Sequence, residues 1–74
     1  MNSKEIEAIG KEIRQVSLQI QAINWKIEGY NKIFDAANLL GDTEESKKTR
    51  DLIESLHILA LDLNSQRIQL LLRL

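Results

Sequence analysis

The sequence predicts an all-α fold, an antiparallel two-helix hairpin that is coiled-coil-like and assembles as a homodimeric four-helix bundle or a higher symmetric oligomer. Three observations predict it. Apolar residues recur through the first half at alternating steps of three and four, a single break occurs at Gly41-Asp42, and the second half holds more aliphatic residues than one helix seam can bury. At this length we expect one helical-hairpin domain, residues 1–74.

The first helix is expected at about residues 3–40. Its apolar stripe keeps one face turned toward a partner helix for about five heptads. The chain contains no proline, so nothing in the sequence interrupts a long helix. The stripe consists of Ile6, Ile9, Ile13, Val16, Ile20, Ile23, Ile27, Tyr30, Phe34 and Ala37.

The turn is expected at residues 41–42 and the second helix at about 43–73. Gly41 suits the left-handed position that ends a helix, and Asp42 with Glu45 has the spacing of a capping box. A turn this short makes the two helices antiparallel neighbours. The expected seam of the second helix is Leu52, Leu56, Leu59, Leu63, Gln66 and Leu70.

The second helix carries two further apolar rows, which predict self-association. A chain of this size usually needs disulfides, a metal or oligomerisation, and this one has no cysteine and a single histidine. We expect polar substitutions at Leu61 and Ile68 to dissociate the oligomer. The two rows are Ile58, Leu61, Ile68 and Leu72, and then Ile53, Ala60, Leu71 and Leu74.

Opposite its main stripe, the first helix carries a second pattern that predicts a binding face. Small residues there would let another backbone approach, and Trp25 has the character of an interface anchor. The favoured partner of this face is the second hairpin of the oligomer, and the alternative is a different protein. The expected partner-binding residues are Leu18, Ala22, Trp25, Gly29, Leu61 and Ile68.

A column of asparagines beside the main stripe, at 24, 31 and 38, allows two interpretations. Amides in such a column can align helices by hydrogen bonding, which is the favoured interpretation, or they can line a small-ligand cleft between protomers. The residues expected to contact a ligand in that alternative are Asn24, Lys26, Tyr30, Asn31 and Arg67.

The segment Tyr30-Asn31-Lys32-Ile33-Phe34-Asp35-Ala36-Ala37 resembles the Tyr-x-x-Ile-x-x-Ala-Ala stretch of phage helical-hairpin domains. Some members of that group sequester cyclic-nucleotide signals of bacterial defence systems, so the resemblance implies a ligand-binding oligomer as an alternative function. It covers under a quarter of the chain, and the second helix here lacks the tryptophans of that group.

The composition argues against several other functions. A net charge of −1 gives no electrostatic reason to bind nucleic acid or anionic membranes, and no apolar run has the length of a membrane span. No cysteine nucleophile, glycine-rich phosphate loop or catalytic triad is recognisable, so we expect no enzyme, cofactor or metal. The leading prediction is a cytoplasmic protein–protein interaction module that binds itself and another protein. A second alternative is a purely structural, self-assembling hairpin.

Overall fold

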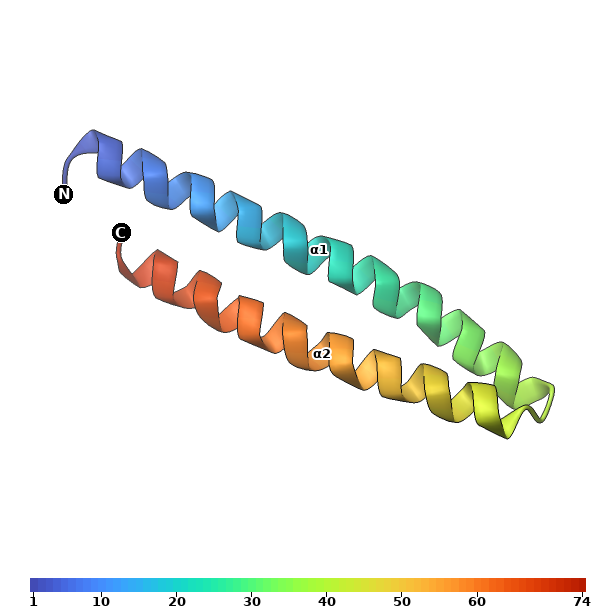
Figure 1. Ribbon diagram of the computed structural model, residues 1–74. Helices are drawn as coiled ribbons and strands as arrows, with labels where there is room; N and C mark the ends of the chain where they lie inside the picture. The colour runs from blue at the N-terminus through green and yellow to red at the C-terminus, as the bar shows by residue number, and fades with distance from the viewer.

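A computed structural model describes all of residues 1–74 as two helices, α1 (Ser3–Leu39) and α2 (Thr43–Leu72). The helices run antiparallel beside each other, so both termini lie at one end of a thin rod (Figure 1). The rod measures 58 × 14 × 11 Å. The predicted two-helix hairpin is therefore confirmed, and the structure contains no strand.

Local hydrogen bonds explain where each helix begins and ends. The side chain of Asn2 accepts a bond from the Glu5 backbone N–H at 2.9 Å, and Asp42 does the same for Glu45 at 3.0 Å, so both N-termini are capped. Gly41 has a φ of 70°, which favours glycine at the end of α1. The Asp42 N–H then reaches back to the Ala37 carbonyl at 2.9 Å, a bond typical of a Schellman motif.

The main stripe of α1 forms one side of the seam, as the sequence predicts. Its members are buried or half-buried except Ile6, which lies near the open end of the hairpin and is 49% exposed. The best-packed cluster lies midway along the rod. It contains Ile20, Ile23, Ile27, Ala60 and Leu63, with Val16, Ile53 and Leu56 packed against it.

The predicted seam of α2 is partly wrong. Leu56, Leu63 and Leu70 do face α1, but Leu52, Leu59 and Gln66 are exposed. Gln66 instead donates a hydrogen bond to Asp62 at 3.1 Å within its own helix. Four other residues take their place in the seam, namely Thr49, Ile53, Ala60 and Arg67. Together with Leu56, Leu63 and Leu70, they follow one another in steps of three and four.

The turn explains this rotation of α2 about its axis. Ser46, in the first turn of α2, donates a hydrogen bond to the Asn38 side chain at 2.6 Å, which holds residue 46 against α1. Steps of three and four from residue 46 lead to 49, 53, 56, 60, 63, 67 and 70. Because α2 is apolar nearly all round, its leucine pattern alone does not determine which face turns inward. The short turn between the helices determines which face of α2 turns toward α1.

The core of the hairpin is small. Only nine of the 74 residues are buried, and eight of these are hydrophobic. Two helices cannot enclose side chains as a three- or four-helix bundle does, so most apolar groups retain contact with water. This explains why so many large hydrophobic side chains lie on the surface of the hairpin.

Candidate partner-binding faces

The outer face of α1 lies opposite the seam and alternates large and small side chains. Trp25 is 64% exposed and Leu18 is 55% exposed, so neither contributes to the core. Gly29 lies in the middle of the helix, and a Cβ placed on it would meet no atom within 4 Å. The α1 outer face consists of Ala8, Leu18, Ala22, Trp25, Gly29, Ala36 and Leu39, all of them exposed, and it is interrupted by the exposed side chains of Lys11, Gln15 and Lys32.

The outer face of α2 is aliphatic. Leu61 is 70% exposed and Ile68 is 55% exposed, and Ser65 lies between them. The spacing from residue 58 to residue 72 is again three and four, so these side chains form one straight stripe along the helix. The α2 outer face consists of Ile58, Leu61, Ser65, Ile68 and Leu72.

The two outer faces point away from each other, because each lies opposite the seam that joins the helices. The chain exposes 5787 Å² of accessible surface. A compact monomer of 8.5 kDa would expose about 4,700 Å². The hairpin therefore has about 1,100 Å² more surface than a compact fold of its mass.

One apolar feature was not predicted from the sequence. A shallow hollow on one flank of the seam is lined by Gln19, Ala22, Ile23, Leu59 and Leu63. Leu59 belongs to this hollow because α2 is rotated relative to the predicted seam. Leu52, at 43% exposed, and Ile33, at 45%, are further hydrophobic residues outside the seam. The sequence pattern did not reveal that Ser46 lies against α1, and this position of Ser46 determines how α2 is rotated about its axis.

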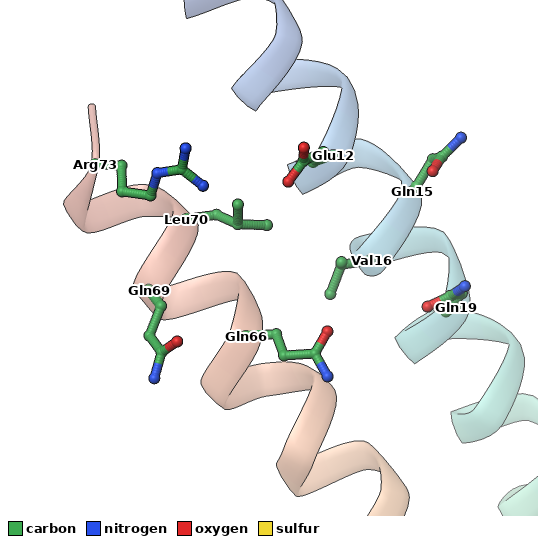
Figure 2. Close-up of a pocket in the computed structure, with 8 residues that line it drawn as sticks. All are labelled: Glu12, Gln15, Val16, Gln19, Gln66, Gln69, Leu70 and Arg73. Atoms are coloured by element: carbon green, nitrogen blue, oxygen red, sulfur yellow. The ribbon is translucent and has the colours of Figure 1, made fainter.

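A more polar hollow lies near the open end of the rod (Figure 2). Val16, Leu70, Glu12 and Arg73 extend into the space between the two helices. No ion pair joins Glu12 to Arg73 within the hairpin. The hollow has a volume of about 320 Å³ and is open to solvent, and four glutamines complete its lining, namely Gln15, Gln19, Gln66 and Gln69.

The residues predicted to contact a small ligand do not gather within one hairpin. Asn24, Lys26 and Asn31 are exposed, whereas Tyr30 and Arg67 are half-buried. Arg67 donates a hydrogen bond to Asn64 at 3.0 Å, and none of the hollows is lined by any of these five residues. A cleft between protomers stays a prediction.

Other chemical features of the hairpin are sparse. Its one ion pair joins Lys11 to Glu7 at 3.9 Å, and no group of three or more histidine, cysteine or acidic residues is arranged to hold a metal ion. Neither helix is apolar enough over a sufficient length to span a membrane. No family model, curated protein or solved structure matches the chain.

Proposed function

We propose that the protein is a non-enzymatic protein–protein interaction module, a small adaptor, inhibitor or chaperone-like regulator that acts through its outer helix faces. The observation that carries the proposal is the pair of apolar outer faces on a hairpin with only nine buried residues. Rows of exposed apolar side chains such as the α2 outer face mark interaction sites, because leaving them in water is costly.

The first partner of the module is another copy of itself. Paired copies form a homodimer or a higher symmetric oligomer, in which the α2 outer face is a contact surface. The straight stripe from Ile58 to Leu72 supports this assignment, because three-four spacing is the pattern that packs helices along a seam. Association would also supply the apolar burial that a two-helix chain lacks.

Replacing Leu61 and Ile68 together with glutamate tests the proposal. Both side chains are exposed in the hairpin, so the double variant should keep its helical circular dichroism. Placing two carboxylates in an apolar contact should at least halve the native mass. The matched control is glutamate at Thr43 and Ser55, exposed positions of α2 that precede the α2 outer face along the helix, which adds the same charge. An oligomer of unchanged mass in the Leu61 and Ile68 variant would contradict this use of the face.

Sequestration of a small ligand between protomers is a second candidate function. The observation that favours it is that the side chains of Asn24, Lys26 and Asn31 are exposed and make no hydrogen bond or ion pair within the hairpin. Tyr30 and Arg67 would contribute from their half-buried positions, with Trp25 or Tyr30 as a stacking surface. A reproducible extra mass of small-molecule size on the native oligomer would favour this candidate over the first.

A further inference from the structure

We infer that the α1 outer face pairs with the same face of a second copy, antiparallel, across a two-fold axis between the levels of Ala22 and Trp25. The inference rests on the proposed function and deepens it, because it names the occupant of this face and the register of the contact. Shape, an otherwise unexplained glycine, charge and surface area each contribute to the argument.

The shape of the face is self-complementary only in the antiparallel arrangement. Together with Lys11, Gln15 and Lys32, its residues form two columns. One has larger side chains at 11, 18, 25, 32 and 39, and the other has mostly small side chains at 8, 15, 22, 29 and 36. In an antiparallel helix pair, each column lies level with the other column of the partner. In a parallel pair, Trp25 would lie against Trp25 of the second copy. The two Gly29 residues would lie opposite each other and leave a gap between the helices.

One register places the large apolar side chains over small ones. With the axis between residues 22 and 25, Trp25 lies over Ala22 of the second copy and Leu18 lies over its Gly29. Leu39 then lies over Ala8 of the second copy. A shift of one heptad toward the N-terminus would place Trp25 over Gln15 and carry Leu39 past the first turn of the second copy.

Gly29 has no role inside the hairpin that explains it. It lies within a continuous helix, has no positive φ, and has open space around the position of its missing Cβ. A glycine inside a helix weakens it relative to alanine. Close approach of Leu18 from a second copy would account for the absence of a side chain at this position.

Charges beside the face are compatible with this register, and they disfavour only the shift toward the C-terminus. The shift toward the N-terminus would also bring opposite charges together, Arg14 beside Glu28 and Lys26 beside Glu12 of the second copy. Arg14 and Asp35 of the second copy lie beside the face within about 3 Å of the same level, and the two-fold axis repeats the pair. Neither residue forms an ion pair within the hairpin. A shift of one heptad toward the C-terminus would place Glu28 beside Glu28 of the second copy and Lys26 beside Lys26 of the second copy. These two like-charge contacts disfavour that register.

The area of the contact is adequate for a stable dimer. Residues 8–39 of each chain would lie side by side over about 46 Å of helix. A standard interface removes about 800 Å² from each partner.

A charge exchange tests both the contact and its register. Arg14→Glu and Asp35→Arg should each weaken self-association about tenfold, because each creates two like-charge pairs, and the double variant should restore it to within about threefold. The two positions are about 32 Å apart along one helix, so rescue cannot arise within a chain. Sedimentation equilibrium measures the effect. Unchanged single variants, tighter association of Asp35→Arg, or a double variant without rescue would overturn the inference.

A size change at Gly29 provides a second test that depends on shape rather than charge. Gly29→Leu should halve the native mass, because the added side chain occupies the space assigned to Leu18 of the second copy. Gly10→Leu is the control, since Gly10 lies outside the α1 outer face and also has no atom within 4 Å of its Cβ position. Both variants should keep the helical circular dichroism of the hairpin.

Retention of the wild-type mass by Gly29→Leu would overturn the inference, and the face would then be available to a helix of another protein. The two proposals fail separately. If the α1 variants have no effect while the Leu61 and Ile68 variant still dissociates, the proposed function stands and this inference fails. If the unaltered protein is a stable monomer, both fail.

Discussion

Thr49 is the most buried residue of the hairpin, at 2% exposure, although the sequence pattern gave no reason to single it out. It lies in a segment with Lys47, Lys48 and Arg50, all of them exposed, and points in the opposite direction from them. Its small size suits the region next to the turn, where the two helices have only just separated. A short β-branched side chain fills that space, and a leucine would overfill it.

Thr49→Leu should therefore destabilise the protein even though it adds apolar surface. We expect a loss of about 1–3 kcal/mol in the free energy of unfolding, measured by urea denaturation at one fixed protein concentration. Thr43→Leu is the control, because Thr43 is exposed at the start of α2 and the same change there should stay within about 0.5 kcal/mol. An equal effect at both positions would contradict the assigned packing of Thr49.

At the scale of elements, the sequence predicts α1 better than α2. The stripe of α1 has one apolar phase, so periodicity alone identifies its inward face. In α2, Leu56, Leu63 and Leu70 belong both to the predicted seam and to the observed one. The choice between Leu59 and Ala60 depends on the hydrogen bond from Ser46 to Asn38, a tertiary contact that periodicity does not report.

The turn is the element on which that choice depends, and Gly41 controls it. Gly41→Ala should lower the free energy of unfolding by about 1–2 kcal/mol, because the φ of 70° is costly for a residue with a Cβ. Gly10→Ala should raise it by about 0.5–1 kcal/mol, because Gly10 is helical and has open space around it. Urea denaturation of the two variants side by side gives both values. Equal effects of the same sign would contradict the role assigned to the turn.

At the scale of the whole molecule, the candidate site could be predicted only in part. The exposure of Leu18, Trp25, Leu61 and Ile68 follows from their positions opposite each seam, and the structure agrees. The identity of the partner that covers these side chains depends on how two surfaces fit together. The sequence pattern of one chain does not contain that information. The antiparallel register proposed for α1 uses the open space around Gly29, which the sequence pattern alone does not show.

The arrangement of the faces also bears on how far assembly proceeds. A two-fold contact through one outer face closes as a dimer of defined mass. Because the two outer faces point away from each other, two-fold contacts through both of them would continue from copy to copy and would not close. If the α1 outer face instead met the α2 outer face of the next chain, the contact would be head-to-tail and could continue into a ring or a fibre. Growth that continues with concentration would therefore favour the purely structural alternative.

The central claim is that the outer faces join copies of the chain, and a native mass spectrum of the purified protein tests it most directly. We predict an even multiple of the 8.5 kDa chain that is retained across a range of concentrations. A helical monomer of 8.5 kDa at micromolar concentration, with both outer faces left in water, would contradict the claim.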